Sequence, residues 1–321
     1  MRKTGVTLLL PAAARFGAQR LSVDSAAALG RAQRMPQGSA GRRAQLLRSI
    51  GLPDGNWPIA ALSRNADAGD AADAAWLRAE PAYLRPDING VRLMAYGDSL
   101  GVSQADTDAL LPALRPLFGD AGFMLDAPVA AHWYLRLPAA ARTPGFADPG
   151  ESLGEDLFEH VLFEHDASPE ARRWRALLSE AQVVLHNHPH NAARAARGQL
   201  PINAIWPWGG GVLPDDRIES RSHYAIVYSN DTVARALATG ACGVDALPRR
   251  FPGTHDLALF DLDAMRDLAV LDRDWLQPAL AALRRGGIGG LAIDGGDGGV
   301  FDFKRWQRLK FWRKPRFRFD E

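Results

Sequence analysis

Residues 257–294 read LALFDLDAMRDLAVLDRDWLQPALAALRRGGIGGLAID and contain the pattern that decides the fold. The apolar runs 257–262 and 291–294 predict two short buried strands. Between them, helical spacing predicts a helix over residues 274–285 that ends at Gly286 and Gly287, where glycine suits a left-handed cap. Such alternation is typical of a largely parallel sheet covered by helices, and it predicts an α/β fold.

The same alternation runs through the rest of the chain. Further strands are expected at residues 6–10, 91–96, 204–206 and 224–228, and further helices at residues 40–50, 104–117, 169–186 and 232–238. The run 6–10 follows Arg2 and Lys3 and resembles the start of a signal peptide, but it is short and is broken by Pro11. We expect it to be a buried first strand.

The composition is that of a globular protein whose charge is unevenly distributed. Of 321 residues, 47% are hydrophobic and 23% are charged, and the formal net charge is +1. Residues 304–321 contain eight Lys or Arg and two acidic residues, so this tail carries +6 and residues 1–303 carry −5. No apolar run approaches the ~20 residues of a membrane-spanning helix. A single cysteine, Cys242, excludes an internal disulfide and a thiolate zinc site, and favours a reducing cytoplasm.

Length sets limits on domain organisation. The chain is long enough for one large domain or two modest ones. We expect a single α/β domain over residues 1–303, with a candidate subdivision near the proline-rich residues 138–152, followed by the basic aromatic tail 304–321. Residues 51–75, rich in Ala, Asp, Gly and Asn, predict a surface excursion.

Three histidines alternate near the middle of the chain: His186, His188 and His190. On a strand, this spacing would aim three imidazoles at one metal ion. Pro189 and the helical pattern before it favour a helix that ends near His186, a break, and a second short helix over residues 191–197. We therefore expect a polar helix junction, with metal binding as the less favoured alternative.

The segment Asn203-Ala-Ile-Trp-Pro-Trp-Gly-Gly-Gly211 follows this junction. It predicts a short strand that ends at Trp206 and a loop whose glycines bring backbone N–H groups close to an anion. No Gly-Lys-Ser/Thr follows, so the segment is not a P-loop. A tight turn packed beneath two tryptophans explains the same residues equally well.

Residues 174–211 carry a resemblance to a known family. Their pattern is Trp-Arg-x-Leu-Leu…Glu-x-Gln…His188-Pro-x-Asn191…Arg194…Gly198…Pro201-x-Asn203-x-Ile-Trp206-x-Trp208-Gly-x-Gly211. It resembles the bacterial RpfE-type regulatory proteins, which are similar to archaeal-type cofactor-independent phosphoglycerate mutases of the alkaline phosphatase superfamily. The RpfE-type resemblance covers nearly the whole chain, whereas the resemblance to the mutases is confined mainly to residues 174–245.

The resemblance implies an alkaline-phosphatase-like core and a set of ligand-binding residues: His188, Asn191, Arg194, Asn203, Trp206, Gly209 and Gly211. A bidentate arginine and glycine N–H groups suit a phosphorylated small molecule. The mutases also share an Asp-Gly pair after the first strand, a Ser or Thr nucleophile, and Asp and His ligands for two metal ions. Here Pro11 follows the first strand, and Gly295 follows Asp294 where a histidine would be needed. We therefore expect a regulatory or ligand-binding protein with a degenerate core, without the metal centre or another cofactor, and we assign no catalytic residue.

Two alternatives stand beside this expectation. The first is an active phosphoglycerate mutase or phosphatase that uses manganese or another divalent metal, with ligands from His255 and the aspartates at residues 261–274. Such acidic clusters are more often solvated turns and helix N-termini. The second is an adaptor that binds an anionic partner, a membrane surface or single-stranded nucleic acid through the tail, where aromatic residues are interleaved with eight cations. Alternatively, Trp306 and Phe311 pack on the body and the cations face water.

Overall fold

The computed structural model describes residues 5–50, 57–87, 90–138, 141–153, 166–214, 222–239, 241–253 and 257–321. The chain forms two compact units, one of residues 1–54 with 216–321 and the other of residues 55–215. The second unit is therefore an insertion in the sequence of the first. Residues 138–152 lie inside the second unit, and the tail 304–321 belongs to the first.

The first unit is built on a seven-stranded sheet with β1 (Val6–Leu10) at its centre. β1 is parallel to both neighbours, β10 (Ala258–Asp261) and β11 (Leu291–Gly295). All five residues of β1 are buried, as expected for a strand covered on both faces, which confirms the predicted first strand. Beyond β10, the sheet continues with the parallel strands β8 (Ile226–Tyr228) and β9 (Gly243–Asp245). Beyond β11, it continues with β12 (Val300–Phe303) and β2 (Gln33–Arg34), each antiparallel to the strand before it.

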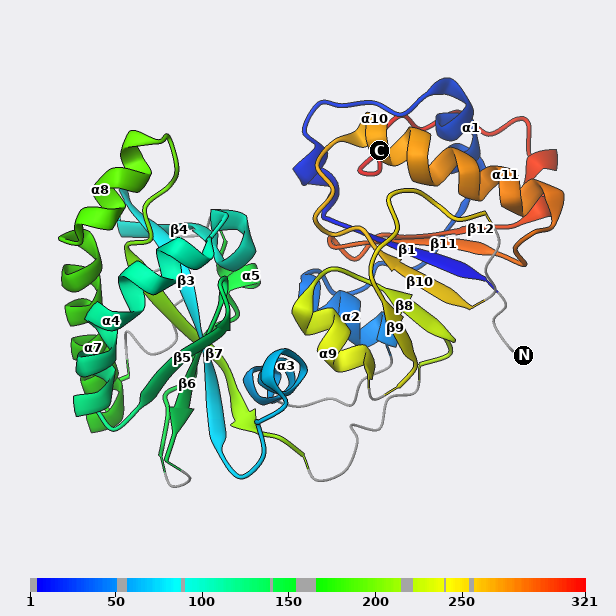
Figure 1. Ribbon diagram of the computed structural model, residues 1–321. Coiled ribbons are helices and arrows are strands. Elements are labelled where there is room, and N and C mark those ends of the chain that lie inside the picture. Colours follow the sequence, from blue (N-terminus) through cyan, green and yellow to red (C-terminus); the bar gives the residue numbers. More distant parts are fainter. Residues whose placement is uncertain are drawn as a thin grey trace. The chain divides into compact units, whose positions relative to one another are not determined.

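Helices cover both faces of this sheet (Figure 1). α1, α10 and α11 lie on one face, and α2 and α9 lie on the other. The positive φ of Gly286, 82°, ends α11 as the sequence predicts. The helical elements are α1 (Val23–Arg31), α2 (Arg42–Ile50), α9 (Thr232–Thr239), α10 (Leu268–Leu271), the π-helical turn η3 (Asp272–Leu276), α11 (Gln277–Arg285), and the short 3-10 helices η1 (Ala13–Phe16) and η4 (Arg305–Leu309).

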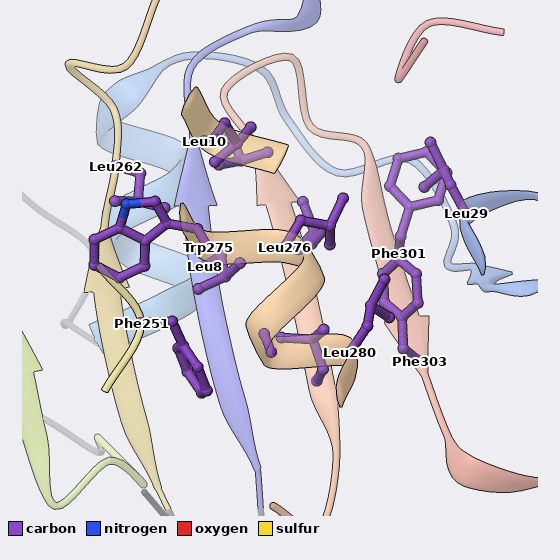
Figure 2. Packing of buried hydrophobic residues seen from close by; sticks show 14 of the residues in the cluster. Leu8, Leu10, Leu29, Phe251, Leu262, Trp275, Leu276, Leu280, Phe301 and Phe303 are labelled. Carbon is purple, nitrogen blue, oxygen red and sulfur yellow. The ribbon is translucent and has the colours of Figure 1, made fainter. Parts of the chain in front are cut away.

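The core of the first unit lies between the sheet and the helices of one face. Figure 2 shows Leu8 and Leu10 of β1 close to Trp275 and Leu276. The Trp275 ring also contacts the ring of Phe260 in β10, with centroids 5.4 Å apart. Each such buried side chain contributes ~1.5–3 kcal/mol. This packing holds β1 and β10 in register, and so fixes where their carboxyl ends lie.

The second unit contains a five-stranded antiparallel sheet that the sequence did not lead us to expect. Its longest strand, β3 (Ala75–Asp87), pairs with three other strands. The three partners of β3 are β4 (Gly90–Tyr96), β6 (His132–Leu137) and β7 (Ala204–Val212). The fifth strand, β5 (Met124–Val129), pairs with β6. The helical elements are α3 (Ile59–Ala68), η2 (Gly97–Leu100), α4 (Gln104–Asp120), α5 (Pro149–Ser152), α7 (Pro169–His186) and α8 (Pro189–Ala196).

The predicted α/β fold with a mostly parallel sheet is confirmed, but the expectation for residues 51–75 is wrong. The described part of residues 51–75 is not a surface excursion, because it contains α3, whose first part, residues 59–64, is mostly buried. Its small residues Ala60 and Ala61 pack in one cluster with Trp76 and Tyr134. Alanine and aspartate suggested an exposed loop, whereas close packing of helix on sheet requires small side chains at the contact.

The basic tail is held against the first unit at its far end. Phe319 is buried against the rings of Phe16 and Phe301, with centroids 6.1 and 6.2 Å away. The backbone N–H of Arg316 donates to the carbonyl of Ala26 in α1 at 2.9 Å. Figure 1 draws this segment in red beside α1. Among the helices of the described residues, none has the length and apolar character to cross a membrane.

Gly30 in α1 permits this close approach of the tail. A Cβ atom there would stand 2.0 Å from the carbonyl oxygen of Lys314. Overpacking costs ~1–3 kcal/mol, so we expect Gly30→Ala to release the tail and to speed trypsin cleavage after Arg313 by roughly tenfold or more. Circular dichroism should show an unchanged fold. The matched control is Gly119→Ala in α4, where a Cβ has open space; equal cleavage rates in both variants would contradict the prediction.

Candidate functional site

Two aspartates mark the carboxyl end of the parallel sheet in the first unit. Asp261 ends β10, and Asp294 is near the end of β11. Both are in register with Leu9 of β1, so they flank the central strand. Two strand spacings of ~4.8 Å place their backbones about 10 Å apart. Ligands of open α/β sheets bind at this edge.

Helix α2 supplies a guanidinium group to each of these carboxylates. Arg42 Nη2 donates to Asp261 Oδ2 at 2.6 Å. Arg48 donates twice to Asp294, from Nη2 to Oδ1 at 2.8 Å and from Nε to Oδ2 at 3.3 Å. Gln45 Nε2 donates to two strand carbonyls, at 2.9 and 2.7 Å. Arg42, Gln45 and Arg48 are spaced three residues apart, so their side chains leave α2 in similar directions and all three contact the carboxyl edge of the sheet.

Burial and ion pairing set the charges at this edge. Burial raises the pKa of Asp294, and Arg48 opposes that shift. Burial lowers the pKa of Arg42, but Asp261 and Asp231 outweigh burial and raise this pKa above its usual value. Arg42 is therefore cationic at any physiological pH.

The donor set at this edge does not fit a two-metal centre. Asp261 Oδ2 accepts from the Ser229 hydroxyl at 2.6 Å as well as from Arg42, and both oxygens of Asp294 accept from Arg48. Within the described residues, no three His, Cys, Asp or Glu side chains are grouped so that they could hold a metal ion. His255, a candidate ligand in the alternative hypothesis, lies outside those residues. Asp261 and Asp294 are each paired with an arginine of α2, and Arg42 also lies 3.8 Å from Asp231.

Other aspartates of the 261–274 stretch serve the local structure. Asp267 is the N-cap of α10 and accepts from two backbone N–H groups of its first turn, at 2.9 and 3.1 Å. Asp272 is buried and accepts from the backbone N–H of Ser22 at 2.9 Å and from the hydroxyl of Ser25. Asp274 pairs with the adjacent arginine. Each of these carboxylates faces a different partner.

The three histidines lie at the predicted helix junction in the second unit. α7 ends at His186, and His188 is the N-cap of α8, where its Nδ1 accepts from the backbone N–H of His190 at 3.2 Å. His190 Nε2 lies 2.6 Å from Asp106 Oδ1 in α4. The polar junction is therefore confirmed.

Arg194 is fully buried, and each of its three side-chain nitrogens is bonded within the protein. Nη1 contacts Asp106, Nη2 donates to the carbonyl of Leu100 at 2.8 Å, and Nε donates to the carbonyl of Leu200 at 3.0 Å. Burial opposes ionisation of Asp106, but hydrogen bonds from the Ser103 backbone and from Arg194 outweigh it and hold the pKa of Asp106 well below its usual range. Arg194 thus ties α8 to α4.

The other polar residues of the predicted pocket also bond to the backbone. Asn191 Nδ2 donates to two carbonyls, each at 2.8 Å, and its Oδ1 accepts from the N–H of Ile202 at 2.9 Å. Asn203 bonds to both backbone groups of Leu84 in β3, at 2.7 and 2.8 Å. The indole of Trp206 donates to a carbonyl at 2.9 Å. These contacts join α8 and β7 to their neighbours.

The expectation that a short strand ends at Trp206 and a glycine loop follows is wrong. β7 continues through Pro207 and the three glycines, antiparallel to β3. A Cβ at Gly209 would stand 2.9 Å from Ile59 Cβ, and one at Gly211 would stand 2.5 Å from Pro58 Cβ. The glycines therefore let the start of α3 approach β7 closely. Binding of a ligand by the seven predicted residues stays a prediction.

A buried polar cluster beneath β3 escaped the sequence analysis. Arg78 donates from Nε to Glu80 Oε1 at 2.7 Å and from Nη1 to the hydroxyl of Tyr134 at 2.9 Å. That hydroxyl donates to Asp67 Oδ2 at 2.6 Å, and His132 Nδ1 lies 2.8 Å from the same oxygen. The alternation of Arg78 and Glu80 within an apolar run was the available signal, because residues two apart share one face of a strand.

Comparisons with known proteins place the chain near one enzyme family. No known protein-family model matches it. Over 160 residues, half of the chain, it is 27% identical to a probable 2,3-bisphosphoglycerate-independent phosphoglycerate mutase of Geobacter sulfurreducens. Over 53 residues, 15% of the chain, it is 40% identical to 2,3-bisphosphoglycerate-independent phosphoglycerate mutase 1 of Methanothermobacter thermautotrophicus. The matches span 38% and 13% of the lengths of these two proteins.

A solved structure is similar over most of the chain. The cofactor-independent phosphoglycerate mutase of Thermoplasma acidophilum covers 94% of this chain over 90% of its own, with 16% identity and a TM-score of 0.37. The relationship therefore rests on the sequence match to the Geobacter protein. Through that match, the chain shows distant homology, at low identity and over half of its length, to the cofactor-independent phosphoglycerate mutases.

Proposed function

We propose that this protein is a phosphoglycerate-mutase-like protein of the RpfE type that lacks the mutase metal centre and acts in regulation or ligand binding. The observation that carries the proposal is the pairing of Arg42 with Asp261 and of Arg48 with Asp294 at the carboxyl edge of the sheet. Distant homology to the mutases supports the scaffold, and the arginines support the loss of the metal centre. A cytoplasmic location, based on the lone Cys242, is part of the same proposal.

Electrostatics explain why these arginines oppose metal binding. A divalent ion held ~5 Å from one guanidinium group is repelled by roughly 7 kcal/mol at an effective dielectric constant of ~20. Displacing the arginines instead would strip Asp261 and Asp294 of their partners and leave two cations without theirs. A metal at this edge would therefore have to offset a large cost before any phosphoryl transfer began.

Elemental analysis and a mutase assay test the proposal together. We expect the purified protein to carry far less than one manganese, zinc or iron per chain, and to show no 3-phosphoglycerate isomerisation above the blank when manganese is added. A related active mutase, assayed in parallel, controls for the conditions. Stoichiometric metal together with turnover that Asp261→Asn abolishes would overturn the proposal and establish the alternative, an active mutase or phosphatase with ligands such as His255.

The ligand in this proposal is a phosphorylated small molecule held around His188 and the Asn203–Gly211 segment. This part of the proposal is supported by the resemblance of the segment to the RpfE-type proteins. The polar atoms of Asn191 and Arg194 bond within the protein, so these two residues would hold the segment in shape instead of contacting the ligand. Thermal-shift measurements with phosphoglycerates check this part, and His188→Ala should remove any stabilisation that they produce.

We further propose that the tail 304–321 binds an anionic partner. The supporting observation is that its aromatic side chains Trp306, Phe311 and Trp312 are exposed, between cations, instead of packed on the body. Deleting residues 304–321 would also remove the buried Phe319. Point variants of the exposed side chains therefore provide the cleaner test.

A further inference from the structure

We infer that residues 305–314, the tail loop, bind the surface of an anionic phospholipid bilayer by inserting apolar side chains between the headgroups. The inference rests on the proposed function of the tail and names its partner. It starts from a concentration of apolar surface: Trp306, Leu309, Phe311 and Trp312 are 53%, 64%, 80% and 66% exposed. Scattered exposed apolar residues are normal, but four within seven positions mark an interaction site.

Buried side chains and backbone hydrogen bonds attach the tail loop to the first unit before and after its exposed residues. Before it, Phe303 ends β12 and is buried, and within it Gln307 is buried and donates to the carbonyl of Asp302 at 3.1 Å. After it, Phe317 accepts from the backbone N–H of Leu21 through its carbonyl at 2.9 Å. The apolar side chains are therefore held outward by an ordered backbone, so that less conformational entropy is lost on insertion.

The charge of the tail loop complements an anionic surface. Residues 305–314 contain five Lys or Arg and no acidic residue. Of these, Arg305, Arg308, Arg313 and Lys314 are exposed. Basic side chains beside Trp, Phe and Leu are the composition of segments that lie in the headgroup region, where cations meet lipid phosphates and apolar groups reach the acyl boundary.

The arrangement of the rings favours a bilayer over single-stranded nucleic acid. Base stacking needs aromatic faces that are open to the bases. Here Lys310 Nζ lies over the Trp306 ring, 4.6 Å from its centroid, and the rings of Phe311 and Trp312 meet at 81°. Leu309 has no ring to stack. Insertion into headgroups requires no such open face, because it depends on apolar area and positive charge.

Vesicle co-sedimentation of the full chain tests the inference. We expect binding to phosphatidylcholine vesicles that contain phosphatidylglycerol, weak binding to pure phosphatidylcholine, and release as salt is raised. Arg308→Gln/Arg313→Gln/Lys314→Gln should weaken the partition coefficient on the order of 100-fold, since each cation near the surface contributes ~1 kcal/mol. The matched control, Arg249→Gln/Arg250→Gln/Arg266→Gln, also removes three exposed cations from the first unit and should change binding little.

A second set of variants tests insertion rather than charge alone. Leu309→Ser/Phe311→Ser/Trp312→Ser keeps every cation and should weaken partitioning by at least about tenfold, because apolar area is lost from the membrane contact. Val23→Ser, at a residue 69% exposed in α1, is the control. In the unmodified chain, brominated lipid should quench tryptophan fluorescence, and Trp306→Phe/Trp312→Phe should lose that quenching. Thermal melting confirms that each variant is folded.

The outcomes separate this inference from the proposal on which it rests. Binding of a single-stranded DNA oligonucleotide with no binding of anionic vesicles would overturn the bilayer inference and keep the anionic-partner function. Binding of neither would overturn both. Vesicle binding that survives loss of the cations, or that is equal on pure phosphatidylcholine, would also overturn the inference.

Discussion

Arg194→Met should destabilise the second unit by about 3–5 kcal/mol, or prevent it from folding, because removing one partner of a buried ion pair leaves the other charge unpaired. Asp106 is 2% exposed and would lose the guanidinium group that holds its pKa low. Two backbone carbonyls, of Leu100 and Leu200, would also lose their donors. Chemical denaturation followed by tryptophan fluorescence measures the loss.

A neighbouring arginine provides the control for this measurement. Arg197 is the exposed C-cap residue of α8, three positions after Arg194, and its Nε donates to the Gln199 side chain at 3.2 Å. Arg197→Met should change the free energy of unfolding by less than ~0.5 kcal/mol, as is usual for surface positions. A similar loss in both variants would show that buried pairing is not the cause.

His132 should make the stability of the second unit depend on pH between about 6.5 and 9. Burial lowers its pKa, but hydrogen bonds to Asp67 and Asp98 outweigh burial and raise the pKa to about 9. A raised pKa means that the folded state binds the proton more tightly than the unfolded state does. The stabilisation is therefore complete below the unfolded pKa of ~6.5, and it is lost as pH rises through the folded pKa.

The size of this effect follows from the shift. A rise from 6.5 to about 9 corresponds to up to about 3 kcal/mol. His132→Gln should lower the free energy of unfolding by this order at pH 6 and by little at pH 10, and Asp67→Asn should flatten the same region of the profile by removing the partner. Denaturation curves recorded across this pH range measure the free energy of unfolding of each variant. Parallel profiles of wild type and His132→Gln would contradict the assignment.

Much of the first unit was predictable because its signals are local. The strand at residues 6–10, the helix cap at Gly286 and the apolar strand 291–294 each follow from a few adjacent residues. β3 was not predictable in this way. It contains Pro81 and Pro86, and proline inside a strand is normally evidence against a strand.

The candidate site, too, could be predicted from the sequence only in part. Its carboxylates could be proposed from the sequence, since Asp294 follows an apolar strand where parallel sheets bind ligands. The seven residues suggested by the resemblance were also visible, yet Asn191 and Arg194 turned out to bond to backbone groups and to Asp106, which no spacing in the sequence indicates. Hydrogen-bond partners across elements depend on packing, so a linear pattern cannot identify them.

By itself, the sequence determined the α/β alternation of the first unit, the concentration of positive charge in the last eighteen residues, and the lack of an acidic residue directly after the first strand. Only the tertiary structure decided that Arg42 and Arg48 neutralise Asp261 and Asp294, partners 219 and 246 positions away along the chain. It also decided that the aromatic side chains of the tail face outward. The physical reason is that local patterns report on neighbouring residues, whereas ion pairs and exposure arise only when distant segments pack together.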